Sequence, residues 1–168
     1  MPEMGEYLVG AWLKLCGSCE LIVYNQKLSP RGIKMNEVDV IGIAPHEKKA
    51  FFCEVGTHLG GLLYAGGNEG TAQKVEEKFK AMIKYASTIF PEFKIQYMLW
   101  APYVPEGILT GLLSKIQVRL QNEDINVQLI INSEYTSRVN QLRMLAKGDT
   151  RDRGEPFYRA MQIIENLR

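Results

Sequence analysis

Hydrophobic positions follow two spacings along the chain, and the change from one to the other predicts ten secondary-structure elements. Apolar residues at three- and four-residue spacing predict helices over residues 3–16, 71–90, 106–121 and 133–148, and a last helix from residue 156. Runs rich in β-branched and aromatic residues predict strands over 19–24, 36–44, 50–55, 94–101 and 127–131. The order αβββαβαβαα predicts an α/β fold in which helices flank a central mixed sheet, a three-layer α/β/α arrangement.

Two acidic residues interrupt the apolar pattern of the second and third strands. Asp39 lies in the run NEVDVIGIA and Glu54 in the run AFFCEV, and the turn-like residues between them predict an antiparallel hairpin. In a hairpin centred between His46 and Glu47, the numbers of facing residues sum to about 93, as those of Asp39 and Glu54 do. The two carboxylates are therefore expected to face each other on one side of the sheet.

Facing carboxylates need a positive partner, because like charges directly opposite each other destabilise a strand pair. A divalent cation is the simplest partner. Carboxylate oxygens from two strands, with a backbone carbonyl such as that of Val55, form the hard oxygen site that Mg²⁺ or Mn²⁺ prefers. In the alternative interpretation, Asp39 and Glu54 are half-exposed sheet residues that pair with lysine or arginine and perform no chemistry.

The hairpin resembles the core of the PD-(D/E)xK nuclease superfamily and is most similar to its resolvase-like branch. In that family, one strand carries the motif acid-Val/Ile-Asp. A later strand carries the motif Glu-x-Lys. Asp39 matches the first acid, Glu54 the second, and Glu6 in the string GEYLVG the early helical glutamate. The resemblance implies a restriction-endonuclease-like fold, with one nuclease-like domain over residues 1–168. Its core would span about 5–101, and an α/β extension about 106–168.

The resemblance also implies a function. Asp39, Glu54 and Glu6 would hold Mg²⁺ or Mn²⁺, and the protein would hydrolyse phosphodiester bonds of nucleic acid. DNA is the expected substrate. The resemblance therefore implies a Mg-dependent deoxyribonuclease that acts as an endonuclease. The resemblance further implies a homodimer.

One position departs from the family pattern. Gly56 stands where the family has a lysine that orients the attacking water and offsets phosphate charge. The next helix supplies Lys74 and Lys78 as candidate catalytic cations, and its helical wheel places Lys78 beside the apolar stripe and Lys74 further out. Lys48 is excluded, because at ~3.3 Å per residue it lies about 20 Å along the strand from Glu54.

Gly56 also leaves a second function open. A nuclease-like fold without the lysine can lose its chemistry and serve as a module for nucleic-acid binding or protein assembly. The retained acids oppose this interpretation, because an inactive site has no reason to bury two carboxylates together.

Two other features each have two interpretations. Glu6 falls on a second apolar line of the first helix, so it either points into the protein or is a solvated helix acid. The predicted loop over 26–34 holds Lys27, Arg31 and Lys34 just before the Asp39 strand. These cations either bind the phosphate backbone of a nucleic acid or are simply solvated.

Composition narrows the class of protein. The chain of 168 residues is 46% hydrophobic and 23% charged, which suits one globular domain. Its apolar runs are far shorter than the ~20 residues of a membrane span, so no membrane association is expected. Three cysteines, an odd number, fit a reducing and therefore cytoplasmic location. A net charge of +1 provides no global attraction for nucleic acid, so local patches must supply it.

Overall fold

A computed structural model describes residues 1–28, 37–58, 60–64 and 66–167 of the chain. The helices in this part are α1 (Met4–Leu15), α2 (Gly67–Ile89), α3 (Ile108–Asn122), α4 (Ser133–Gly148) and α5 (Pro156–Glu165). The strands are β1 (Leu21–Lys27), β2 (Glu37–Ala44), β3 (Lys49–Val55), β4 (Lys94–Ala101) and β5 (Val127–Ile131). Their order confirms the predicted succession αβββαβαβαα.

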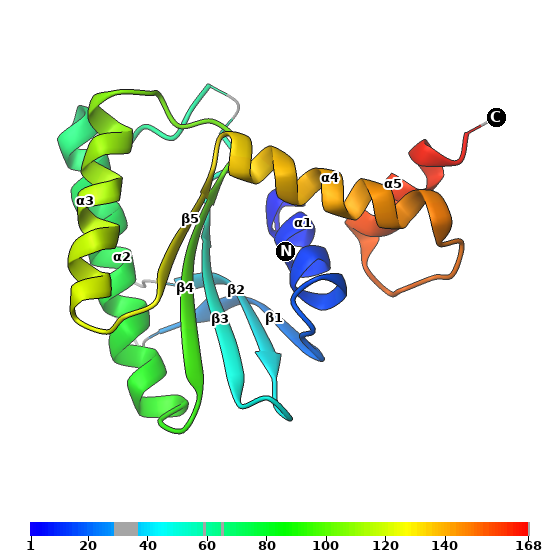
Figure 1. Cartoon of the computed structure of the whole chain (residues 1–168), viewed down its shortest axis with the longest axis horizontal. Helices are drawn as coiled ribbons and strands as arrows, with labels where there is room; N and C mark the ends of the chain where they lie inside the picture. The colour runs from blue at the N-terminus through cyan, green and yellow to red at the C-terminus, as the bar shows by residue number, and fades with distance from the viewer. Residues whose placement is uncertain (29–36, 59, 65, 168) are drawn as a thin grey trace.

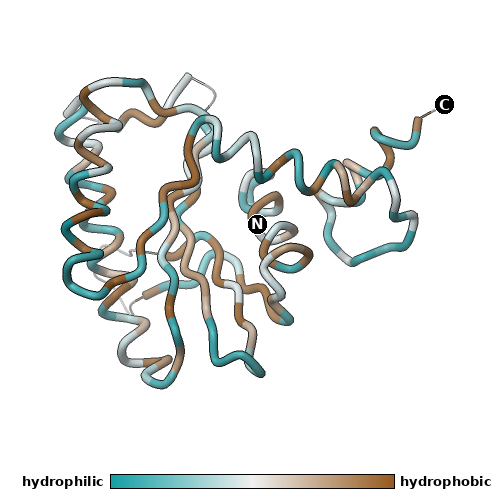
Figure 2. Tube along the Cα trace, viewed as in Figure 1, coloured by the Kyte–Doolittle hydropathy of each residue, from teal (hydrophilic) through white to brown (hydrophobic). Residues whose placement is uncertain are grey.

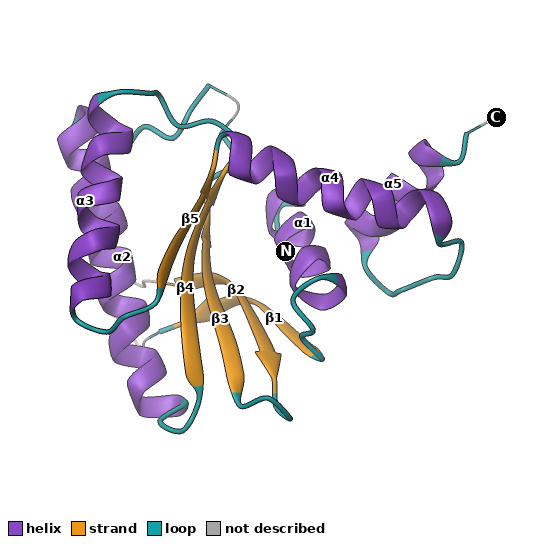
Figure 3. Cartoon of the chain, in the orientation of Figure 1, coloured by secondary structure: helices purple, strands orange, loops and turns teal. Residues whose placement is uncertain are grey.

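The strands form one mixed sheet in the order β1-β2-β3-β4-β5 (Figure 3). β1, β2 and β3 are antiparallel neighbours, whereas β4 runs parallel to β3, and β5 parallel to β4. The parallel pairs require crossovers, which α2 and α3 provide. Because β5 pairs directly with β4, the expected core and the expected C-terminal extension share one sheet.

Helices cover both faces of the sheet, which confirms the three-layer arrangement (Figure 1). α2 and α3 lie on one face, and α1, α4 and α5 lie on the other. Alternate residues of β3 enter the two cores: Phe52 packs on the side of α2, and Phe51 and Cys53 pack on the side of α1. Figure 2 shows apolar residues along the strands and a hydrophilic turn between β2 and β3.

The end of β1 and the start of α2 differ most from the sequence prediction. β1 continues to Lys27, so the predicted loop over 26–34 begins too early. α2 begins at Gly67 rather than Thr71. Its first turn is held by Thr71, whose hydroxyl donates to the Gly67 carbonyl at 2.7 Å and accepts the Tyr64 N–H at 2.8 Å. These two hydrogen bonds support a helix start that contains glycines, which have low helix propensity.

None of the helices in the described ranges is long and apolar enough to cross a membrane.

Candidate functional site

Asp39 and Glu54 lie side by side on β2 and β3, as predicted. The ladder pairs Val40 with Cys53, so one step further brings Asp39 opposite Glu54. Asp39 alternates with Ile41 and Glu54 with Phe52, two residues of the core under α2, so both carboxylates face that side of the sheet. Asp39 is 7% exposed and Glu54 is 2% exposed. Burial contradicts the half-exposure of the alternative interpretation, whereas the pairing with lysine that it expects is found for Glu54 and Lys78.

The Asp39 carboxylate is held by the backbone of β3. Its Oδ2 accepts the N–H of Val55 at 2.7 Å, so the side chain takes a donor that would otherwise serve the strand pair. Burial raises the pKa of Asp39, while the Val55 N–H and the positive charge of Lys78 act in the opposite direction. Val55 thus contributes an N–H that fixes the orientation of the acid.

Glu54 has one paired and one unpaired oxygen. Oε1 pairs with the ammonium group of Lys78 from α2. Oε2 is fully buried and has no hydrogen-bond partner among the residues that the structure describes. Burial, and after it the charge of Asp39, raises the pKa of Glu54 to about 8. An orphaned buried carboxylate oxygen beside a second carboxylate is costly unless a cation or a proton joins them.

Lys78, from α2, brings a positive charge to the two acids. Burial lowers the pKa of its ammonium group, but the carboxylates of Glu54 and Asp39 outweigh burial, and the net change is upward. Lys78 therefore stays charged beside the two acids. Of the two predicted candidates, the structure brings Lys78 to Glu54.

Lys74 has a different contact. Its ammonium group lies 4.0 Å from the ring centroid of Tyr64, a cation–π contact at the exposed rim of the site. Burial raises the pKa of Tyr64, and the negative charge of Glu54 adds to the rise. Sequence reasoning missed Tyr64, because nothing in the glycine-rich stretch around it distinguishes it from an ordinary loop residue.

A side chain at position 56 would collide with the loop that follows. A Cβ built on Gly56 would lie 2.7 Å from Cδ1 of Leu62, which is fully buried. The Leu62 N–H donates to the Tyr103 carbonyl at 2.9 Å, which holds this part of the loop in place. Leu62 thus fills the space beside Gly56, and a larger side chain at position 56 would require Leu62 to shift.

Glu6 lies on α1 and is 9% exposed, so it points into the protein rather than into solvent. Its Oε2 accepts the N–H of Glu3 at 3.1 Å in a capping box at the start of α1. Burial raises the pKa of Glu6, and the nearby charge of Asp39 adds to the rise. No three acidic, histidine or cysteine side chains in the described ranges form a metal-binding group. The role of Glu6 as a direct ligand stays a prediction.

The remaining predicted residues lie elsewhere. Lys27 is the exposed last residue of β1, whereas Arg31 and Lys34 lie outside the residues that the structure describes. Lys48 sits in the hairpin turn and pairs with Glu92 at 2.8 Å, away from the acids as expected.

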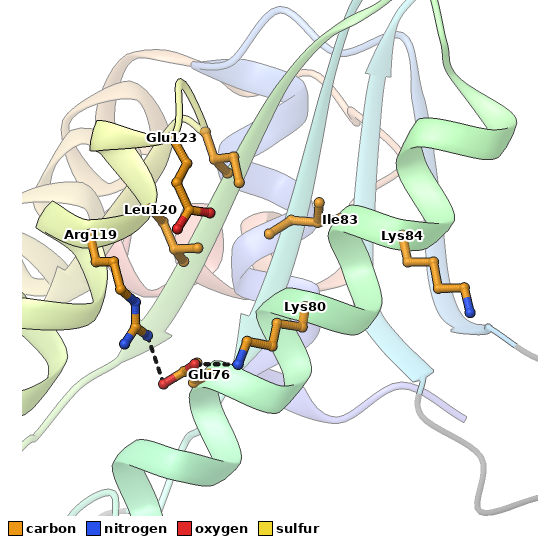
Figure 4. A pocket seen from close by; sticks show the side chains of 8 residues that line it. Glu76, Lys80, Ile83, Lys84, Arg119, Leu120 and Glu123 are labelled. Carbon is orange, nitrogen blue, oxygen red and sulfur yellow. Dashed lines mark ion pairs between the residues drawn. The ribbon is translucent and has the colours of Figure 1, made fainter.

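A separate cavity of about 400 Å³ lies between α2 and α3 (Figure 4). Glu76 stands among its cations, pairing with Arg119 at 2.7 Å and with Lys80. Glu76 is thus already paired, and the described residues that line the cavity include no buried polar side-chain atom without a partner. The buried acids near Lys78 are the stronger candidate.

Comparisons with known protein families, with curated proteins and with solved structures found no match.

Proposed function

We propose that Asp39, Glu54 and Lys78 form a metal-dependent centre that cleaves phosphodiester bonds of nucleic acid, with DNA as the first substrate to test. The proposal includes a restriction-endonuclease-like fold for the core of the chain. The observation that carries it is the buried, unpartnered Oε2 of Glu54 next to the Asp39 carboxylate.

The residues present fit a divalent cation. Hard carboxylate oxygens are the ligands that Mg²⁺ and Mn²⁺ prefer. A cation held by Asp39 and Glu54 would offset the repulsion between the two acids and give Glu54 Oε2 the partner it lacks. When bound, such an ion lowers the pKa of water and stabilises negative charge on a phosphate.

The protein residues would hold and orient the reacting groups. The Val55 N–H fixes the Asp39 carboxylate at 2.7 Å, so this ligand is oriented before any cation arrives. Lys78 pairs with Glu54 and carries a positive charge into a largely buried setting. There it can stabilise the charge that develops on a phosphate, the role that resemblance assigns to the lysine absent at Gly56.

Metal binding is the first test. Titration calorimetry with Mn²⁺ should show binding to the wild type, and Asp39→Ala should abolish it, because half of the carboxylate ligands are lost. Lys48→Ala is the matched control, since Lys48 forms an exposed ion pair remote from the acids. Absence of binding at millimolar Mn²⁺ would remove the basis of the proposal.

Cleavage is the second test. The wild type with Mg²⁺ or Mn²⁺ should cut duplex, single-stranded or branched DNA in a panel that also includes RNA, and Asp39→Ala should not. If the wild type binds the metal and nucleic acid but cuts no member of the panel, a binding module replaces the nuclease. That outcome would be expected if Lys78 already neutralises the charge of Glu54.

A further inference from the structure

Lys74 and Lys78 lie on the same side of α2, one turn apart. Residues four apart in a helix are neighbours on its surface, and at ~1.5 Å per residue their positions are about 6 Å apart along the axis. The Lys78 ammonium group pairs with the buried Glu54 carboxylate, whereas Lys74 is exposed. The two lysines therefore form a short row of positive charge that runs from solvent to the acids.

The ammonium group of Lys74 is not paired with an acid. Among the residues that the structure describes, no carboxylate lies within ion-pair distance of it, whereas Lys80 on the same helix pairs with Glu76. Glu77, three residues after Lys74, instead accepts a hydrogen bond from the amide of Gln73 at 3.0 Å. The positive charge of Lys74 thus remains available to an anion from outside the chain.

The ring of Tyr64 holds Lys74 in place. The Lys74 ammonium group lies 4.0 Å from the centroid of this ring. The ring is itself fixed, because Tyr64 packs against the core under α2 and its N–H donates to the hydroxyl of the buried Thr71 at 2.8 Å. A cation–π contact attracts the ammonium group to a ring without net charge. It therefore restrains the lysine without neutralising it.

We propose that Lys74, held over the ring of Tyr64, binds the phosphate next to the cleaved one on the same nucleic-acid strand. The inference rests on the proposed function, in which Lys78 stabilises charge on the cleaved phosphate. The one-turn spacing of the two lysines lets a single strand contact both. Contacts to phosphate position a nucleic acid without reading its sequence. Lys74 thus contributes to substrate binding, and Lys78 to the chemical step.

The salt dependence of binding measures this contact without cleavage. Binding of a fluorescein-labelled oligonucleotide is followed in EDTA at several salt concentrations, as a single strand and as a duplex. Each phosphate contact contributes about 0.7 for single strands, and about 0.9 for duplex DNA, to the slope of log K against log salt. Lys74→Met should reduce the slope by about this amount and weaken binding by a similar factor for every sequence.

Lys80→Met is the matched control for this experiment. It removes the same charge from the same helix, but Lys80 pairs with Glu76 on the side of α2 that faces α3 (Figure 4). It should keep the wild-type slope. A wild-type slope in Lys74→Met, or an equal reduction in both variants, would overturn the proposal.

Cleavage kinetics separate the roles of the two lysines. Lys74→Met should raise KM about tenfold, as expected for the loss of a hydrogen bond to a charged group. Its kcat should stay unchanged, because the contact is the same in the ground state and the transition state. Lys78→Met should instead lower kcat. A fall in kcat without a rise in KM for Lys74→Met would contradict its assignment to binding.

Variants of Tyr64 test whether the ring positions Lys74. Tyr64→Phe keeps the ring and should bind the oligonucleotide like the wild type. Tyr64→Leu removes the ring and should weaken binding about 2- to 5-fold, the range of an exposed cation–π contact. In the Lys74→Met background, Tyr64→Leu should add little. Equal losses in Tyr64→Phe and Tyr64→Leu, or an undiminished further loss in the double variant, would overturn the role of the ring.

The inference and the proposed function fail in different ways. If the wild type binds oligonucleotides through Lys74 but cleaves none, the nuclease function is wrong and the phosphate contact stands. If the wild type cleaves DNA while Lys74→Met keeps the wild-type salt slope and KM, the contact is wrong and the nuclease stands. A wild type that binds no oligonucleotide would overturn both.

Discussion

Protonation of Glu54 offers a test of the site that needs neither substrate nor metal. Burial and the neighbouring Asp39 carboxylate raise the pKa of Glu54 from its ordinary value of 4.5 to about 8. In the unfolded chain the same carboxyl group returns to its ordinary pKa. Between these two pH values the folded protein binds a proton that the unfolded chain does not, so stability must fall as the pH rises.

The size of the effect follows from the pKa. At about 1.36 kcal/mol per pKa unit, a rise from 4.5 to about 8 corresponds to roughly 5 kcal/mol of unfolding free energy. This contribution is complete below pH 4.5 and is lost as the pH rises to 8. Glu54→Gln keeps the shape of the side chain and has no such proton to lose. As the pH rises through this range, the melting temperature of Glu54→Gln should therefore increase relative to that of the wild type, by up to about 10–20 °C.

Urea and thermal unfolding in EDTA, from about pH 5 to about pH 8.5, measure this difference. Glu92→Gln is the matched control, because Glu92 is an exposed partner of Lys48 and its variant should follow the wild-type pH dependence. At pH 8, added Mn²⁺ should stabilise the wild type more than Glu54→Gln, since a cation replaces the proton between the acids. A constant difference between wild type and Glu54→Gln at every pH would refute the reasoning.

Further predictions concern the groups around the acids. Lys78→Met should lower Mn²⁺-dependent cleavage by about 10²–10³ in single-turnover assays and leave Mn²⁺ affinity nearly intact, because it removes a cation that acts on the phosphate; Lys48→Met should cleave like the wild type. Gly56→Ala should destabilise the protein by about 1–3 kcal/mol in urea unfolding, because its Cβ would lie 2.7 Å from Leu62 Cδ1. The double variant Gly56→Ala with Leu62→Ala should show a smaller loss than the sum of the two single changes, and strict additivity would argue against the collision.

The position of the two acids could be predicted from the sequence, because the spacing of residues on either side of a hairpin turn determines which residues face each other. Once the turn between β2 and β3 is located, every pair along the two strands follows, and Asp39 must face Glu54. The succession of helices and strands was readable for a similar reason, since the apolar periods are local properties of each segment. Boundaries were less accurate where a contact with a neighbouring loop, such as that of Thr71 with Tyr64, supports the start of an element.

Other features depended on how distant segments pack. The helical wheel left Lys74 and Lys78 as alternatives, because the angle at which α2 crosses the sheet is set by core packing and not by the helix itself. That packing brings Lys78 to Glu54 and leaves Lys74 over the ring of Tyr64.

The conformation of Asn25 and the filling of the space beside Gly56 are likewise tertiary results. Asn25 adopts a left-handed backbone opposite Asp39, and no local pattern distinguishes it from its neighbours in β1. The steric reason for a glycine at position 56 is the buried Leu62, six residues later along an irregular loop. Local sequence therefore determined the elements and the facing acids, whose geometry repeats along a hairpin. Tertiary packing decided which lysine reaches Glu54 and which loop residue fills the space beside Gly56, because these contacts join segments whose relative placement no periodicity specifies.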